Sequence, residues 1–159
     1  MLKDFLILIV LTILPFLELR ASIPYGIFNT DFTIAQVFII CTMVNIALAP
    51  ILYLFVNHVM HFFLRIKFVE KIYYKVVERT QKKIHPYVEK YGILGMAIAI
   101  GIPLPGSGVY SGALGAYLLG FKFRDYLIAA IIGVLIAGLV VLIISVTGSE
   151  AFSFMIKRI

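Results

Sequence analysis

Charged residues are scarce in this chain. Asp, Glu, Lys and Arg make up 14% of its 159 residues, whereas 62% are hydrophobic and the mean hydropathy is +1.07. A typical soluble domain contains about 25% charged residues. This scarcity excludes an ordinary soluble domain and predicts an all-α integral membrane protein, in which helices pair every backbone polar group internally.

Cysteine is almost absent as well. Cys41 is alone and lies within an apolar run, so the sequence contains neither a disulfide framework nor a cysteine-based metal cluster. It also lacks a nucleophile–histidine–acid arrangement, and its glycine-rich segment has no lysine for a phosphate-binding loop. We therefore expect no enzyme activity, no cofactor and no metal site.

Acidic residues are fewer than basic ones, which gives a formal net charge of +6. The basic residues lie mainly beside apolar segments, where anionic lipid head groups are found. Eight of them fall between residues 65 and 90, and Lys and Arg concentrate on the cytoplasmic side of membrane proteins. We therefore expect membrane lipids rather than nucleic acid as partners. We also expect a multi-pass protein of a prokaryotic plasma membrane.

Four apolar stretches lie between the charged residues. The fourth has no charge and no proline, and it is long enough to cross the ~30 Å hydrocarbon layer as a helix. The second is longer than one crossing needs, and Pro50 is expected to kink it. The stretches cover residues 5–30, 32–64, 91–121 and 126–149.

The first and third stretches share interruptions that the other two lack. Prolines break the first between Pro15 and Pro24, which we expect to be unwound, and the third between Gly101 and Gly108. Paired interruptions in the two halves of a chain are typical of transporters. They predict an inverted repeat, each half made of a re-entrant helical hairpin and a transmembrane helix. Kinked full spans are the alternative.

The repeat divides a single membrane domain, residues 1–159, into three parts. Repeat 1 covers residues 1–64 and repeat 2 covers residues 91–159. Residues 65–90 have apolar side chains on one helical face and charged ones on the other, which predicts a basic amphipathic helix on the cytoplasmic membrane surface. Hairpins would place both termini outside, whereas full spans would place them in the cytoplasm.

Glu18 and Arg20 are the charges that lie within an apolar stretch. Each costs about 2.5–3.5 kcal/mol at the middle of a lone transmembrane helix, so such groups are kept only when paired, hydrated or used. In an unwound segment they can point to one side, where they could pair or share a bound anion. We predict that Arg20 binds an anionic group of a substrate and that Glu18 is its counter-ion or a proton carrier. A purely structural ion pair is the alternative.

The second break offers backbone groups rather than charge. Glycines allow positive φ, and free amides at a helix N-terminus can hold an anion. Serine hydroxyls add further polar contacts. We therefore assign this segment to the substrate-binding site together with Glu18 and Arg20, and its residues are Pro103, Pro105, Gly106, Ser107, Gly108 and Ser111.

Other small and polar residues in the apolar stretches are interpreted as packing. Asn45 is expected to join helices by hydrogen bonds, with a place along the substrate path as the alternative, and Tyr110 to be an interface or packing aromatic. Small residues also recur at every fourth position, which predicts close helix contacts along two stripes. These are Gly108, Gly112, Ala116 and Gly120 in one stripe, and Ala129, Gly133 and Ala137 in the other.

The two break motifs together resemble those of the small multidrug export protein family. Its first motif, Pro-x-x-Glu-x-Arg-x-x-x-Pro, matches Pro15 to Pro24 here. Its second, Pro-x-Pro-Gly-Ser/Thr-Gly-x-aromatic-Ser-Gly, matches Pro103 to Gly112. The family is distantly similar to the DedA, or SNARE-associated (VTT-like), superfamily. That resemblance implies paired re-entrant hairpins that carry polyprenyl-phosphate lipids, with Arg20 binding the phosphate and Glu18 coupling to protons.

These expectations combine into a membrane transporter that moves an amphiphilic or anionic substrate, such as a polyprenyl-phosphate-type lipid, with proton coupling. The chain is short for a transporter, so we expect a homodimer. Two alternatives stay open. One is an exporter of small cationic drugs, for which Glu18 would have to be unpaired and accessible. The other is a non-transporting protein that organises lipids or aids assembly.

Overall fold

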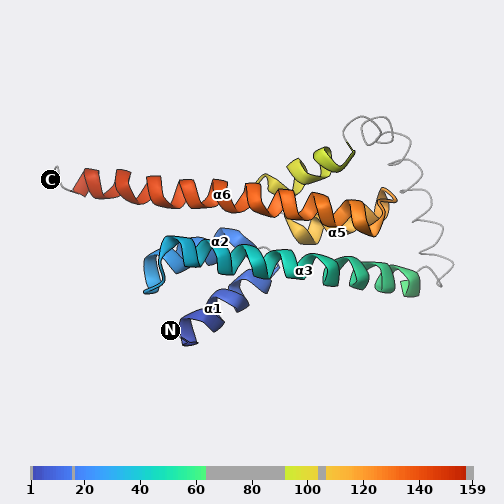
Figure 1. Cartoon of the computed structure of the whole chain (residues 1–159), viewed down its shortest axis with the longest axis horizontal. Helices are drawn as coiled ribbons and strands as arrows, with labels where there is room; N and C mark the ends of the chain where they lie inside the picture. Colours follow the sequence, from blue (N-terminus) through green and yellow to red (C-terminus); the bar gives the residue numbers. More distant parts are fainter. Residues whose placement is uncertain (1, 16, 64–91, 104–106, 157–159) are drawn as a thin grey trace.

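The computed structural model describes residues 2–15, 17–63, 92–103 and 107–156, with the backbone alone for residues 61–63 and 149–156. All regular structure in these ranges is helical, so the predicted all-α class is confirmed for the described part. The predicted amphipathic linker helix lies outside it. The helices are α1 (Leu2–Ile13), α2 (Glu18–Asn29), α3 (Ile34–Phe63), a short helix at Gly92–Gly101, α5 (Val109–Leu118) and α6 (Phe123–Ile156) (Figure 1).

Two long helices, α3 and α6, pack against each other and form the frame of the molecule (Figure 1). Each contains a segment long and apolar enough to cross a membrane: Ile34–Met60, with a mean hydropathy of 2.3, and Phe123–Gly148, with 3.3. Only 39% and 33% of these windows are buried, whereas a core helix of a soluble protein is mostly buried. The two uninterrupted helices predicted from the sequence are therefore present, and Pro50 lies inside α3 without ending it.

The shorter helices form two antiparallel pairs. The end of α1 and the start of α2 lie beside the middle of α3, and the Gly92–Gly101 helix and α5 approach the same region from the opposite end (Figure 1). A helix of 12 residues, such as α1, spans about 18 Å, which is less than the ~30 Å hydrocarbon layer. The start of α1 and the end of α6 lie at one end of the molecule, and the end of α3 lies at the other (Figure 1).

The break in the first pair is shorter than the sequence predicts. The expectation that the chain is unwound from Pro15 to Pro24 is wrong, because α2 begins at Glu18 and Pro24 lies inside it. Proline removes only the hydrogen bond to the carbonyl of Arg20, and α2 is retained because it packs against α1, α3 and α6. Among the described residues, the departure from helix is confined to Leu14, Pro15 and Leu17, which lie between α1 and α2, and to the positive φ of 42° at Glu18.

Glycines of the two small-residue stripes allow the second pair to pack closely. A Cβ added to Gly112 would lie 2.7 Å from the Ile100 side chain. One added to Gly133 would lie 2.7 Å from the carbonyl oxygen of Ala97. Real Cβ atoms do not approach this closely. The contact with the Ala97 backbone therefore requires glycine at 133, and a Cβ at 112 would force the Ile100 side chain to shift. The packing interpretation is confirmed for Gly112 and Gly133.

Candidate functional site

The two helical breaks meet at one place, where the first turns of α2 and α5 face each other beside α3. The first pair contributes charged side chains, and the second contributes mainly backbone groups. We call this place the junction and define it by Glu18, Arg20, Asn45, Ser107, Gly108, Val109 and Tyr110.

The Glu18 side chain is buried at the centre of the junction. Only 7% of the residue is exposed, and its carboxylate accepts backbone hydrogen bonds from Val109 and Tyr110, the first two residues of α5. The first amides of a helix have no partner within it and carry partial positive charge. A carboxylate from α2 therefore meets the N-terminus of α5 where negative charge is stabilised.

Gly108 allows this contact in two ways. Its φ of 112° is favourable only for glycine. A Cβ at this position would lie 2.8 Å from Oε1 of Glu18 and closer still to Oε2. Any other residue would therefore strain the backbone and displace the carboxylate, so the glycine of the second break is required by the acid of the first.

Arg20 reaches across the junction but does not pair with Glu18. Its Nη2 donates to the carbonyl oxygen of Ser107 at 3.0 Å and to the Ser107 hydroxyl at 2.7 Å, and that hydroxyl donates in turn to the carbonyl of Ile102. Within the described residues, no ion pair with N···O of 4.0 Å or less joins Arg20 to Glu18. The simple ion pair weighed from the sequence is therefore absent, and neutral oxygens hold the guanidinium.

Asn45 contributes a polar group from α3 that sequence analysis interpreted as packing. The residue is fully buried and faces the Glu18 carboxylate. The geometry nevertheless makes no hydrogen bond, so in the described part of the chain neither Nδ2 nor Oδ1 has a partner. An unsatisfied buried amide costs about 1–3 kcal/mol, so its retention calls for an explanation.

Two tyrosines fix the start of α5. The Tyr110 hydroxyl donates to the carbonyl of Ile13, at the end of α1, and thereby ties the two breaks together. The fully buried Tyr126 of α6 donates to the carbonyl of Val109 at 3.1 Å and stacks on Tyr53. No role for Tyr126 was predicted, because its position in the first turn of a long helix carries no local signal of one.

Space at the junction is small. A cavity of about 10 Å³ lies among α2, α3, α6 and the start of α5, which is room for one water molecule. Apart from the junction residues, its walls are aliphatic. They are formed by Leu19, Ile100, Val134, Ala137 and Val141.

The structure brings together half of the predicted binding residues. Glu18, Arg20, Ser107 and Gly108 meet directly, as described above. Ser111 uses its hydroxyl within α5, where it donates to the carbonyl of Gly108 at 3.2 Å. The structure says less of the remaining three. Pro103 is the last residue described before the gap at 104–106, and Pro105 and Gly106 lie outside the described residues.

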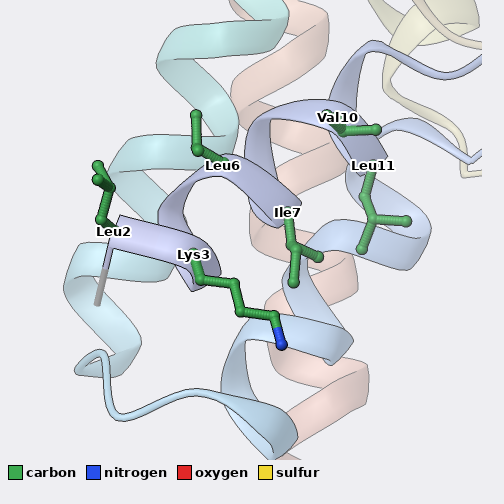
Figure 2. A pocket seen from close by; sticks show the side chains of 6 residues that line it. All are labelled: Leu2, Lys3, Leu6, Ile7, Val10 and Leu11. Atoms are coloured by element: carbon green, nitrogen blue, oxygen red, sulfur yellow. The ribbon is translucent and has the colours of Figure 1, made fainter.

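A wider hollow of about 490 Å³ lies along α1, away from the junction (Figure 2). Its walls are apolar except for one lysine, and it contains none of the predicted site residues. It is lined by Leu2, Lys3, Leu6, Ile7, Val10 and Leu11. We do not assign it to the functional site.

Two long apolar helices and a buried charged junction define a helical membrane protein with a polar centre. Residues 18–140 match the family model described as "Putative small multi-drug export protein". The chain belongs to this family, and the match contains every junction residue. No curated protein and no solved structure matches the chain. The similarity to the DedA group stays a prediction.

Proposed function

We propose that this protein is a transporter that moves an anionic or amphiphilic substrate through the junction, with Arg20 as the residue that binds the anionic group. The observation that carries the proposal is the environment of Arg20. Its guanidinium is partly buried, and its two hydrogen bonds come from one nitrogen and go to neutral oxygens of Ser107. Arginine has five N–H donors that suit carboxylate and phosphate groups, so it retains capacity for a ligand.

Phosphate-bearing amphiphiles, such as polyprenyl-phosphate-type lipids, are the substrate class that fits this environment. An apolar tail is compatible with the aliphatic walls around the junction, and a phosphate is compatible with a guanidinium and a helix N-terminus. Transport needs no catalytic residue, and the proposal assigns none.

The helical pairs act in this proposal as two re-entrant hairpins of an inverted repeat. Their support is the short length of α1, the position of the adjoining helix ends of each pair near the middle of the long helices, and the approach of the pairs from opposite ends (Figure 1). With the basic segment 65–90 in the cytoplasm, both termini would lie outside. A C-terminal reporter that is active only in the cytoplasm should therefore be silent, and an active reporter would exclude hairpins.

Glu18 is the proposed proton carrier. It is the acidic residue buried in the described part of the apolar core. The charged and titratable side chains that act on its carboxylate there are Arg20 of α2, Tyr110 of α5 and Tyr126 of α6. We expect Glu18→Gln to remove any dependence of transport on a pH gradient, because glutamine keeps the shape but cannot release a proton. Unchanged coupling in this variant would exclude the proton role.

The test of the proposed function is native mass spectrometry of the purified protein, which we expect to be a homodimer. Wild type is compared with Arg20→Ala and with Arg124→Ala, which removes an exposed arginine outside the junction. We expect an anionic lipid to co-purify with wild type and Arg124→Ala, and to be lost from Arg20→Ala. Equal lipid in all three proteins would contradict anion binding by Arg20.

Export of small cationic drugs is the second candidate, and the family description is the observation that favours it. Such a function would require the Glu18 carboxylate to bind the cationic group of the drug. Here that carboxylate is buried, accepts bonds from α5 and lies beside an aliphatic cavity rather than an aromatic one. Flux of a cationic dye that depends on Glu18 but not on Arg20 would favour this candidate over the first.

A further inference from the structure

The Glu18 carboxylate lies where the structure concentrates groups that bind oxyanions. The backbone amides of Val109 and Tyr110 donate to it, and the positive charge of Arg20 stabilises it from nearby. Gly108 has no side chain, which lets an oxygen atom come close to the backbone at the start of α5. The same features hold phosphate and carboxylate ligands at helix N-termini in other proteins.

Asn45 provides an independent sign of a ligand. Its amide is fully buried, lines the same cavity and has no hydrogen-bond partner in the described residues. A buried amide normally finds partners, because leaving one unpaired costs about 1–3 kcal/mol. The Glu18 carboxylate lies near this amide but outside hydrogen-bonding geometry, so the Nδ2 donor of Asn45 is available to an oxygen atom that comes closer.

The size of the cavity decides how such a ligand would bind. At about 10 Å³ the space accommodates one water molecule, whereas a phosphate group is several times larger. A phosphate oxygen cannot join the Glu18 carboxylate beside the α5 amides. It can bind only where the carboxylate is now, after the Glu18 side chain has moved away.

We propose that the junction is an oxyanion-binding site whose resting occupant is Glu18 itself, so that the Glu18 carboxylate and the phosphate group of a substrate compete for the same amides. This inference rests on the proposed role of Arg20 as the anion-binding residue. Release of Glu18 would free the amides of Val109 and Tyr110, the Asn45 amide and the unused guanidinium donors together. Substrate and proton would then be coupled by competition, because a protonated Glu18 is a weaker competitor than a charged one.

If Glu18 competes with the phosphate, removing Glu18 should strengthen phosphate binding. If Glu18 instead contacts the bound substrate, removing it should weaken binding. The apparent affinity of a site is proportional to the fraction of time during which the site is free to bind. If Glu18 occupies the site about 90% of the time, its removal should tighten phosphate binding about tenfold. The gain should disappear when Arg20 is also removed.

The experiment measures binding of dodecyl phosphate and, separately, of inorganic phosphate to the full chain in an uncharged detergent by isothermal titration calorimetry. Glu18→Ala and the isosteric Glu18→Gln are compared with wild type at pH 7.5. Asp31→Ala is the matched control, because it removes an exposed acidic residue outside the junction. Glu18→Ala combined with Arg20→Ala tests whether the gain occurs at this site.

We expect tighter binding to Glu18→Ala and, more weakly, to Glu18→Gln, with wild-type affinity for Asp31→Ala and loss in the double variant. Wild type should also bind more tightly at pH 5.5 by a margin that Glu18→Ala does not show. A gain for dodecyl phosphate alone identifies a lipid head group as the source, and a gain for both probes includes free phosphate. Equal or weaker binding to both Glu18 variants would overturn the competition.

Flux through proteoliposomes separates this inference from the proposed function. If wild type moves dodecyl phosphate and Arg20→Ala does not, the transport proposal stands whatever the Glu18 variants bind. If wild type moves none while the Glu18 variants still gain affinity, transport is contradicted and the competition is retained.

Discussion

The two helical pairs supply opposite kinds of group to the junction. The first pair contributes charge, through Glu18 and Arg20, whereas the second contributes backbone, through the amides at the start of α5 and the positive φ of Gly108. Each set is unfavourable in an apolar environment without the other, because a buried charge and a free helix N-terminus both need partners. The comparison teaches that a chain this apolar can keep an acid and an arginine at its centre when its two halves are chemically complementary.

Among the substitutions considered, one at Gly108 should weaken the contact between the pairs most. We expect Gly108→Ala to lower the free energy of unfolding by about 3 kcal/mol or more, because strain at positive φ adds to displacement of the Glu18 carboxylate. Thermal unfolding in detergent checks this. The matched control is Gly120→Ala. Gly120 has a φ of 73°, but a Cβ added there has no atom within 4 Å, so this substitution should cost only about 1–2 kcal/mol.

A double substitution sharpens that result. If the extra cost of Gly108→Ala comes from the carboxylate, then Glu18→Ala should remove part of it, and the two effects should not add. Additive costs would show that the backbone strain of Gly108 accounts for its effect. The contact between the pairs would then contribute little.

Gly133→Ala should disturb the packing of the second pair against α6. The added Cβ would lie 2.7 Å from the Ala97 carbonyl oxygen, which as backbone cannot easily move, so we expect a loss of about 1–3 kcal/mol. Gly148→Ala is the control in the same helix. Its Cβ meets nothing within 4 Å, and alanine favours helix by about 1 kcal/mol, so this variant should be as stable as wild type or more so.

Asn45 should separate stability from function. We expect Asn45→Leu to raise the free energy of unfolding by about 1 kcal/mol, because it removes two unsatisfied buried polar atoms, and to weaken binding of dodecyl phosphate. Unfolding and titration of the same sample check both effects. A variant that loses stability and keeps full binding would return Asn45 to a packing role.

The smallest effect is expected from the hydroxyl that joins the two breaks. Tyr110→Phe removes the donor to the Ile13 carbonyl and should cost about 1 kcal/mol of stability. Tyr53→Phe is the counterpart away from the junction, since its hydroxyl donates to the carbonyl of Phe121 at 2.8 Å. Both should lower stability similarly, but only Tyr110→Phe should change flux. An equal flux in the two variants would mean that this hydrogen bond is structural only.

The sequence predicts the individual helices and breaks of this molecule better than the contacts between them. The apolar runs give the long helices α3 and α6, and the prolines mark both breaks, because these signals are local along the chain. The extent of the first break is mispredicted, since packing against three other helices keeps Pro24 within α2. The contact of the Glu18 carboxylate with the first amides of α5 joins residues about ninety positions apart in the chain, so no local sequence pattern predicts it.

Asn45 shows the same limit at the scale of one residue. A polar side chain in an apolar run predicts a hydrogen bond across helices, yet its buried amide finds none among the described residues. Whether such a residue joins helices or faces a cavity depends on the rotation of α3 against its neighbours. That rotation is set by contacts along the whole helix.

Flux of dodecyl phosphate through proteoliposomes tests the central claim most directly, because it asks whether the junction carries an anion. Wild type is compared with Arg20→Ala and Arg124→Ala at equal reconstituted amounts. We predict flux at least about tenfold slower for Arg20→Ala, corresponding to the loss of one charge-assisted contact, and unchanged flux for Arg124→Ala. Equal flux through all three proteins would contradict the account.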